Sequence, residues 1–345
     1  MNLVEDFMAV IKDVANLAGV SISTVSKYFN NPSGLSEAYR EKVERAVKEL
    51  NFFPNAMARG LRTKRTNTIA LIVPDITNTF YVEVYNLIRT AAIAKGFTTQ
   101  LYTTEENINI LSDLLSQFSP AKIDGLILCF LDEDEITAKL SEAQSNLPIA
   151  LLSWNVNNPL NSVVLNLHSA IYHATSYLID QGHTRIAYVN GTDGHISEEK
   201  ASGYLKAMED HGLPIREEYI CSGKHLFRTG YLAAKQFMQL SEPPTGIVAA
   251  NDVIAIGCCK YLRTHDYRIP QDVSVTGMDG IHLSHVYDPS ITTMAMPAAE
   301  MCQEAVDMLI HSIEKPGSKT KISIYESKLV IGRSTNADAP LYLDF

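Results

Sequence analysis

The stretch KDVANLAGVSISTVSKYFN, residues 12–30, has the pattern of two short helices joined by a tight turn. Small apolar residues recur on one face of the first helix: Val14, Ala15 and Ala18. Gly19 follows where that helix must end, and Ser21 is suited to cap the second helix by accepting the backbone N–H of Thr24. This pattern predicts a helix-turn-helix, whose second helix can enter the major groove of DNA.

The exposed face of the second helix carries side chains that can read DNA: Ile22, Ser23, Ser26 and Lys27. They supply a methyl-bearing group, hydroxyls and a cation, which can meet thymine methyls, base-edge acceptors and guanine or phosphate oxygens. The alternative is a generic small helical pair in which Lys27 is merely solvated.

A third helix is predicted after the loop NNPSG, with Ser36 as its cap. Its apolar face consists of Tyr39, Val43, Ala46, Val47 and Leu50. Because three short helices give a thin core, we expect Phe52 or Phe53 to complete it.

Residues 54–67 form a short basic segment that begins at Pro54. Asn55, Ala58 and Leu61 fall at helical spacing, but Gly60 and the short length predict that such a helix is largely unfolded in water alone. Its basic residues are Arg59, Arg62, Lys64 and Arg65. The composition fits a hinge that folds against a DNA minor groove and offers it Ala58 and Leu61, and it fits a plain basic linker equally well.

Charge is distributed unevenly along the 345 residues, whose net charge is −10. Residues 1–67 hold ten Lys/Arg against seven Asp/Glu, whereas the remainder holds 19 against 32. A basic head on an acidic body is what a protein needs if only its head should touch phosphate. Random clustering of charge is the competing explanation.

Several features indicate the compartment. The five cysteines are odd in number and include no CxxC pair, which predicts reduced, mostly buried thiols. No run approaches 18 apolar residues, so no membrane span is expected. The start MNLVEDFMAV has no basic region followed by a long apolar one, which argues against secretion. We therefore expect a cytoplasmic protein.

From Thr68 onward, buried strands alternate with apolar-striped helices, which predicts parallel sheets covered on both faces. The first set of strands comprises TIALIVP, FTTQLYT, DGLILCF and LPIALLS, with a helix near Glu135 to Gln144 before the last. The second set comprises SVVLN, RIAYVN, a strand near Tyr219, GIVAAN and DVSVTGMD. Two similar sets indicate two lobes with a cleft between them.

In open α/β sheets, ligands bind beyond the carboxyl ends of the strands. The sequence has no GxSxG, GxGxxG, GxxxxGK[ST] or HExxH motif, and His282 and His285 have no third metal ligand nearby. We therefore expect no enzyme activity, no metal and no cofactor. Strand-end Asn and Asp residues beside Phe80, Tyr81 and Trp154 suit a neutral polyhydroxyl ligand instead, although these aromatic residues could also be ordinary core.

The motifs resemble those of the lactose/galactose-repressor (LacI/GalR) family of bacterial transcription regulators. The resemblance rests on IKDVANLAGVSISTVSKYFN, on REKVERAVKELNFFPNAMARGLRTKRTNTIALIVPDITNTFY, and on KIDGLIL, DQGHTRIAYV, AANDVIAIG, IPQDVSVTGMD and PSITTM. It extends from Met8 to about Thr335.

The resemblance implies an all-α helix-turn-helix headpiece and a two-lobed α/β core with parallel sheets, like the periplasmic binding proteins. The expected units are residues 8–53 for DNA binding, 54–67 for a hinge helix and linker, and 68–345 for effector binding and dimerisation. Within the core, the first lobe is expected at about 68–157 plus 292–318, and the second at about 158–291 plus 319–335. The chain would thus cross between lobes near Ser290 and again near Lys319.

The expected DNA contacts are Ser21, Ile22, Ser23, Ser26, Lys27, Asn30, Ser36, Asn55, Ala58 and Leu61. By resemblance, Ile22 and Ser23 select bases, whereas Asn30 and Ser36 contact phosphates. The implied effector contacts are Phe80, Tyr81, Trp154, Lys200, His225, Asn251 and Asp279.

Three positions depart from the family pattern. Lys27 and Lys200 stand where Arg is usual, and a lysine cannot make the planar two-point contact of a guanidinium. Leu165 stands where many members have Asp, which removes a polar contact.

These features predict a repressor that binds a double-stranded DNA operator as a homodimer under control of a small molecule, with a carbohydrate favoured. The alternatives are an activator or dual regulator of the same family, a solute-binding receptor, and an enzyme with a DNA-binding head.

Overall fold

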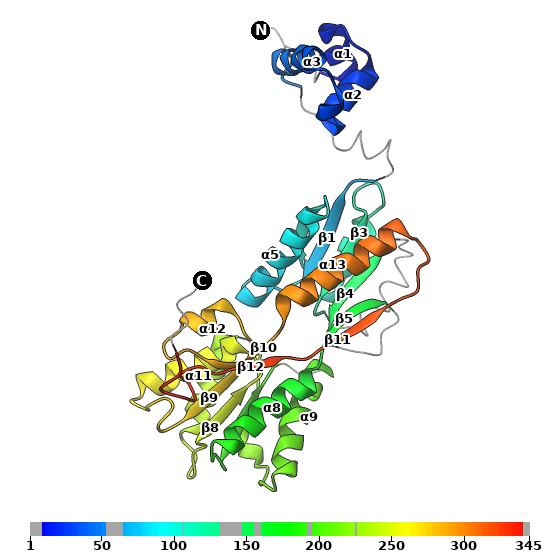
Figure 1. Cartoon of the computed structure of the whole chain (residues 1–345). Coiled ribbons are helices and arrows are strands. Elements are labelled where there is room, and N and C mark those ends of the chain that lie inside the picture. Colours follow the sequence, from blue (N-terminus) through cyan, green and yellow to red (C-terminus); the bar gives the residue numbers. More distant parts are fainter. Residues whose placement is uncertain are drawn as a thin grey trace, which may run out of the picture. The chain divides into compact units, whose positions relative to one another are not determined.

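The computed structural model describes residues 9–52, 65–105, 107–131, 147–154, 160–191, 195–224 and 226–340. The chain divides into two compact units, residues 1–66 and residues 67–345. We call them the headpiece and the core (Figure 1).

Within residues 9–52, the headpiece contains three α-helices: α1 (Ile11–Ala18), α2 (Ile22–Asn30) and α3 (Glu37–Glu49), with the 3-10 turn η1 (Pro32–Gly34) between the last two. Gly19 ends α1 with a left-handed backbone (φ 62°), a conformation that costs glycine nothing. The hydroxyl of Ser21 accepts the N–H of Thr24 at 3.1 Å, which starts α2. The shared core consists of Val14, Ala15, Ala18, Val25, Val43, Ala46 and Phe52. The predicted helix-turn-helix is confirmed, with Phe52 as the residue that closes its core.

Two predictions for α3 were wrong. Tyr39, in the first turn of α3, lies outside the core and is 49% exposed. Ser36 occupies the N-cap position but its side chain makes no capping hydrogen bond. The buried residues of α3, Val43 and Ala46, lie further along the helix.

The core contains two six-stranded sheets, ordered β11-β5-β4-β3-β1-β2 and β12-β10-β9-β8-β6-β7. The strands of the first sheet are β1 (Thr68–Val73), β2 (Thr98–Thr103), β3 (Gly125–Cys129), β4 (Ile149–Ser153), β5 (Asn161–Leu165) and β11 (Ile322–Tyr325). Those of the second are β6 (Ile186–Asn190), β7 (Ile220–Ser222), β8 (Gly246–Ala249), β9 (Ser274–Asp279), β10 (Thr292–Ala295) and β12 (Lys328–Val330). Among the described residues, the pairings of these strands are parallel except that of β10 with β12.

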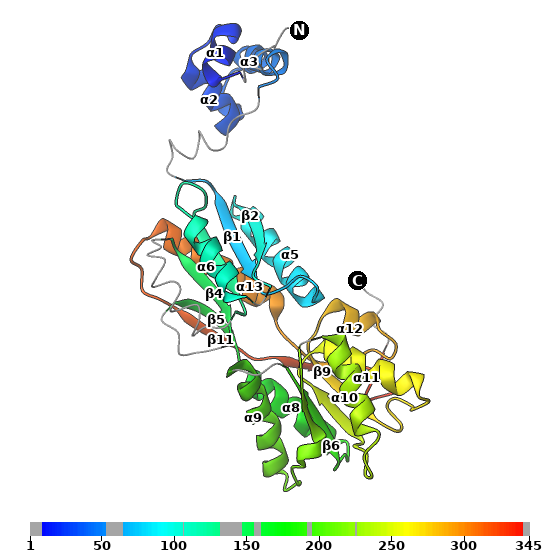
Figure 2. The same cartoon turned by 180° about the vertical axis from the view of Figure 1, so that it is seen from behind.

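Helices cover the first sheet on both faces, as alternate apolar residues of its strands require. One face packs on α5 (Thr79–Ala94) and α13 (Ala298–Glu314), and the other packs on α6 (Ile108–Gln117) (Figures 1 and 2). In β1, Leu71 belongs to the first cluster and Ile72 to the second. We call this sheet with its helices the first lobe.

The second sheet, with its helices, forms the second lobe. Its helices are α8 (Leu167–Asp180), α9 (His195–Asp210), α10 (Phe227–Phe237), α11 (Asp252–Thr264) and the short α12 (His282–Val286), and the 3-10 turn η2 (Glu217–Tyr219) precedes β7. Helices α10 and α11 touch backbone to backbone. A Cβ added to Gly230 would lie 1.9 Å from the carbonyl oxygen of Ile254. Residue 230 therefore has to be glycine, because there is no room for a side chain.

The predicted strands of the core are all present, but the predicted lobe boundaries were wrong. SVVLN, expected in the second sheet, forms β5 and pairs with β4 in the first. β10 was expected in the first lobe, after a crossing near Ser290, but it pairs with β9 in the second sheet. β11 was expected in the second lobe, after the crossing near Lys319, but it pairs with β5 in the first sheet. The chain therefore crosses between the lobes after β5, after β10 and after β11. Hydrogen bonds between segments some 160 residues apart decide this, and periodicity does not reveal them.

Other sequence predictions concern thiols and membranes. All five cysteines are free, and four of them are buried, as predicted. Among the described residues, we find no helix of sufficient length and apolar character to span a membrane. The predicted helix near Glu135 to Gln144 lies outside the described residues.

Candidate functional site

The outer face of α2 presents the predicted base-reading side chains. Ile22 is 44% exposed, which is high for a large apolar residue, and Ser23 and Lys27 are exposed beside it. Ser26 is half-buried. The Lys27 side chain runs along the following loop, since a Cβ at Gly34 would lie 2.9 Å from Lys27 Cε.

Ser21 has a structural role in this surface. Besides capping α2, its hydroxyl lies 2.7 Å from the hydroxyl of Ser23 and 2.8 Å from that of Thr24. These contacts orient Ser23 at the start of the helix. The Ser36 hydroxyl is exposed at the start of α3.

Four predicted DNA contacts lie partly or wholly outside the described structure. Asn30 is the last residue of α2, but its side chain is not described. Asn55, Ala58 and Leu61 lie outside the described residues.

Aromatic rings gather at the carboxyl ends of three strands of the first lobe. Asn78 follows β1 and caps α5 by accepting the N–H of Phe80. The Phe80 ring lies 5.2 Å from that of Tyr81 and 5.3 Å from that of Phe130, which follows β3. Phe130 in turn stacks on Trp154, which follows β4, with ring centroids 4.0 Å apart. The structure thus brings together three predicted effector contacts and adds Phe130.

Phe130 was missed because an aromatic residue after an apolar strand resembles ordinary core. The feature that distinguishes Phe130 is its backbone conformation, which cannot be read from the sequence. Its φ is 55°, a left-handed conformation that is strained for a bulky side chain. In this conformation the ring stacks on Trp154 at the end of the sheet.

Ionisable groups gather at the facing strand ends of the second lobe. Lys200, on α9, is 4% exposed, and its ammonium donates a hydrogen bond to the carbonyl oxygen of Ala250 at 2.9 Å. The same nitrogen lies 5.9 Å from the centroid of Trp154 in the other lobe. Asp279 ends β9 with a left-handed backbone (φ 113°). The Lys200 ammonium of the second lobe therefore lies beside Trp154 of the first, and the Asp279 carboxyl group is within electrostatic range of Lys200.

Burial and mutual interaction shift the pKa values of these groups. Burial lowers the pKa of Lys200, and the Asp279 carboxylate opposes that shift. Burial raises the pKa of Asp279 well above its usual value; Lys200 opposes this shift, whereas the carboxylates of Asp252 and Glu83 add to it. Carboxylates outnumber the cation in this group.

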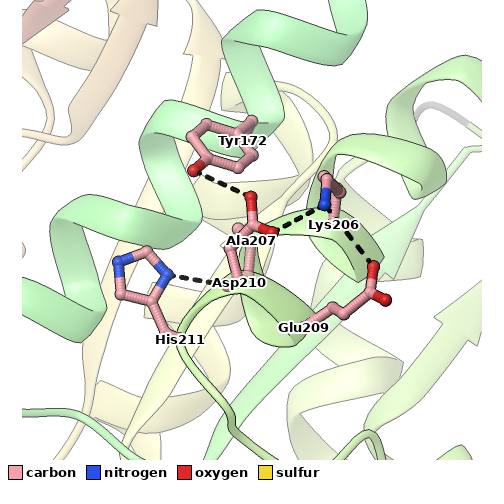
Figure 3. A network of polar contacts seen from close by, with 6 residues as sticks. All are labelled: Tyr172, Lys206, Ala207, Glu209, Asp210 and His211. Atoms are coloured by element: carbon pink, nitrogen blue, oxygen red, sulfur yellow. Dashed lines mark hydrogen bonds and ion pairs between the residues drawn. The ribbon is translucent and has the colours of Figure 1, made fainter.

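Helix α9 is fixed firmly against α8, which positions Lys200. A Cβ at Gly203 would lie 2.3 Å from the carbonyl oxygen of His168, so the two helices are in backbone contact. At the far end of α9, the Tyr172 hydroxyl donates to Asp210 at 3.3 Å, and Lys206 pairs with Asp210 at 2.6 Å (Figure 3).

Asn251, a predicted effector contact, caps α11: its side-chain oxygen accepts the N–H of Ile254 at 2.8 Å. Its neighbour Asp252 is fully buried, and one of its oxygens accepts the N–H groups of Gly280 and Ile281 at 2.8 and 2.9 Å. Asp252 thereby holds the turn that follows Asp279. Burial raises the pKa of Asp252 to about 7.

His225 lies outside the described residues. Leu165 is fully buried at the end of β5, and Asn166 caps α8 and donates to Glu326 beside the last crossing between the lobes. In the described part of the chain, no group of three or more His, Cys, Asp or Glu residues is arranged to hold a metal ion.

Comparisons with known proteins agree with this architecture. Residues 10–55 match the sequence model for bacterial regulatory proteins of the lacI family, and residues 66–331 match that for periplasmic binding proteins and the sugar-binding domain of the LacI family. The chain is 34% identical over 312 residues to the ribose operon repressor of Escherichia coli (strain K12), covering 90% of this chain and 94% of that protein. It is 32% identical over 326 residues to the HTH-type transcriptional repressor PurR of Vibrio parahaemolyticus, covering 94% and 98%.

A solved structure extends the similarity to the whole fold. The lac repressor dimer bound to operator and the anti-inducer ONPF is 25% identical, with a TM-score of 0.83, and covers 95% of this chain and 99% of that one.

Proposed function

Because this chain belongs to the lacI family of bacterial regulatory proteins, a family of DNA-binding transcription regulators with an effector-binding domain, we propose that it represses transcription as a homodimer whose effector is a neutral sugar or sugar derivative. The observation that carries the effector proposal is the proximity of Lys200 of the second lobe to Trp154 in the aromatic group of the first, with Asp279 within electrostatic range of Lys200.

The exposed face of α2 supports the proposal for operator contacts. Ile22 can meet a thymine methyl, whereas Lys27 can contact guanine or phosphate. Ile22→Ala should change the preferred bases, and Lys27→Ala should weaken binding to all sequences if it contacts phosphate. Both effects can be measured by selecting operators from random duplex DNA and repeating the titrations over a salt series.

Exposed apolar side chains in the core support dimerisation. Val82 and Ile93 on α5 are 39% and 53% exposed, and Leu283 and Val286 on α12 are 40% and 43% exposed. Apolar surface of this kind is typical of protein interfaces. A dimer has two headpieces, so it would read twice the length of operator that a single headpiece can read. Analytical ultracentrifugation should give a dimer, and Val82→Asp should give a monomer that binds operator poorly.

The chemistry of the site supports a neutral effector. An aromatic face can pack on the C–H face of a sugar ring, while a carboxylate and an ammonium can share its hydroxyl groups. In this group of described residues Lys200 is the cation, and burial lowers its pKa, so the group offers a phosphorylated sugar little positive charge. A neutral polyhydroxyl ligand can pack on the aromatic rings and form hydrogen bonds with the ionisable groups.

Trp154 is the single tryptophan of the chain, so intrinsic fluorescence reports on this site directly. We expect D-ribose or another neutral sugar to change Trp154 emission in a saturable titration, and phosphorylated sugars to have no effect. Nucleobases complete the panel because a flat base could also stack on these rings. If a nucleobase binds and no sugar does, the proposal of a sugar effector is wrong, but the proposed regulation by a small molecule still stands.

Two substitutions should separate the sites. Leu61→Ala should impair operator binding and leave effector binding intact, whereas Asp279→Ala should do the opposite. If Leu61→Ala binds operator normally, the proposed hinge contact is wrong.

A further inference from the structure

Three consecutive backbone N–H groups follow Asp279, and two carboxylates accept them. Gly280 and Ile281 donate to Asp252 at 2.8 and 2.9 Å. His282 donates to both carboxylate oxygens of Glu83, at 3.1 and 3.3 Å. The turn that carries a proposed effector contact is thus held at both of its ends.

The two carboxylates come from different lobes. Asp252 begins α11 in the second lobe, beside the turn that it holds, so its contacts are internal to that lobe. Glu83 lies in the first half of α5, in the first lobe, shortly after the aromatic residues Phe80 and Tyr81. Its hydrogen bonds with His282 therefore depend on the relative position of the lobes, whereas those of Asp252 do not.

We propose that Glu83 is a positioning residue that latches the two lobes together and links the effector turn to α5. This inference rests on the proposed function, in which Asp279 contacts effector and α5 contributes to the dimer interface. A ligand that moves Asp279 would also move the N–H of His282, and Glu83 transmits that change to α5. The route is short: it passes from Asp279 through residues 280–282 to the helix that carries exposed Val82.

The surroundings of Glu83 distinguish a latch from a solvated helix residue. Its carboxylate is half-buried, and burial raises its pKa, while the backbone N–H and the side chain of His282 favour the charged form. Burying a carboxylate is unfavourable unless hydrogen bonds replace its water, and the donor that does so here belongs to the other lobe. Glu83 also raises the pKa of Asp279, which places the two carboxylates within electrostatic reach.

The latch can be tested without effector or DNA, because Trp154 in the first lobe is contacted by Lys200 of the second. We would measure Trp154 emission and its quenching by acrylamide in the full-length protein, in Glu83→Ala and in Glu83→Gln. Glu314→Gln is the matched control, since Glu314 is an exposed residue of α13 in the same lobe.

If the latch holds the lobes together, Glu83→Ala should shift the emission to longer wavelength and raise the quenching constant about two-fold, because separated lobes expose the indole. Glu83→Gln keeps one acceptor oxygen and should give an intermediate value, and it carries the test should Glu83→Ala fail to fold. Glu314→Gln should match the unmodified protein.

Unchanged emission and quenching in the folded Glu83 variants would overturn the latch. That outcome would leave the proposed function standing, since DNA and sugar binding are measured separately. Conversely, a protein that binds no sugar could still show the effect of Glu83→Ala, so the two failures are distinguishable.

Discussion

Apart from Glu83, the first lobe meets the lobe boundary with aromatic rings, whereas the second meets it with ionisable groups. Both lobes are built on six-stranded sheets with neighbouring strands in a similar order. Yet the strand ends of the first carry Phe80, Phe130 and Trp154, and those of the second carry Asp252 and Asp279 with Lys200 beside them. One fold thus presents two different surfaces at the lobe boundary, where we propose that the effector binds.

This difference leads us to expect different contributions of the two lobes to effector affinity and effector choice. Aromatic faces attract any flat apolar surface, so they contribute affinity with little discrimination between hydroxyl patterns. Buried charged groups need partners in defined directions, so a ligand that lacks the matching hydroxyl leaves them unsatisfied. We therefore expect substitutions in the second lobe to change effector choice and those in the first to change affinity more uniformly.

The largest effect on effector binding is expected from Asp279→Ala. Loss of a hydrogen bond to a charged group should weaken sugar binding roughly 30- to 100-fold. Trp154 fluorescence titration measures this, and operator binding without sugar serves as the control. A sugar affinity within a few-fold of the original would remove Asp279 from the site.

Asp252→Asn should reduce the pH dependence of core stability. The pKa of Asp252 rises from 3.8 to about 7 on folding, so the folded protein binds the extra proton. The stabilisation from that proton is complete below about pH 4 and is lost as the pH rises through about 7. Asparagine keeps an oxygen for Gly280 and Ile281 but does not titrate, so the variant should lose less stability between pH 5 and 8, by on the order of 2 kcal/mol.

Urea unfolding at several pH values measures this slope. Asp272→Asn is the matched control, because the pKa of Asp272 is lowered to about 2 by Arg268 and it titrates below the range tested. Equal slopes in the Asp252 variant and the unmodified protein would contradict the assignment.

The smallest effect is expected from Phe130→Leu. Removal of the ring stacked on Trp154 should reduce the stability of the core by about 1 kcal/mol and weaken sugar binding about five-fold. Phe118→Leu is the matched control, because Phe118 packs on Tyr102 in the other cluster of the first lobe. It should lower stability without changing sugar affinity. Equal sugar affinities in the Phe130 variant and the unmodified protein would show that Phe130 does not shape the site.

Local chemistry allowed much of this structure to be predicted from the sequence. Gly19 and Ser21 mark the ends of two helices because a left-handed turn and a side-chain cap are decided by neighbouring residues. Phe80, Tyr81, Trp154, Lys200 and Asp279 were recognised from family motifs, and the structure brings them to one boundary.

Contacts between distant segments could not be predicted in this way. β5 and β11 pair across some 160 residues, so the crossings between lobes were misplaced. Glu83 was missed for the same reason, because it matters through a partner, His282, that lies far away in the sequence.

The most direct measurement is the anisotropy of a fluorescent operator, selected from random duplex DNA, titrated with the protein in the absence and presence of a saturating sugar that alters Trp154 emission. We predict that the sugar changes operator affinity about 5- to 150-fold and that the change disappears in Asp279→Ala. An unchanged operator affinity at saturating sugar, or no DNA binding at low salt, would contradict control of the headpiece by the two-lobed core.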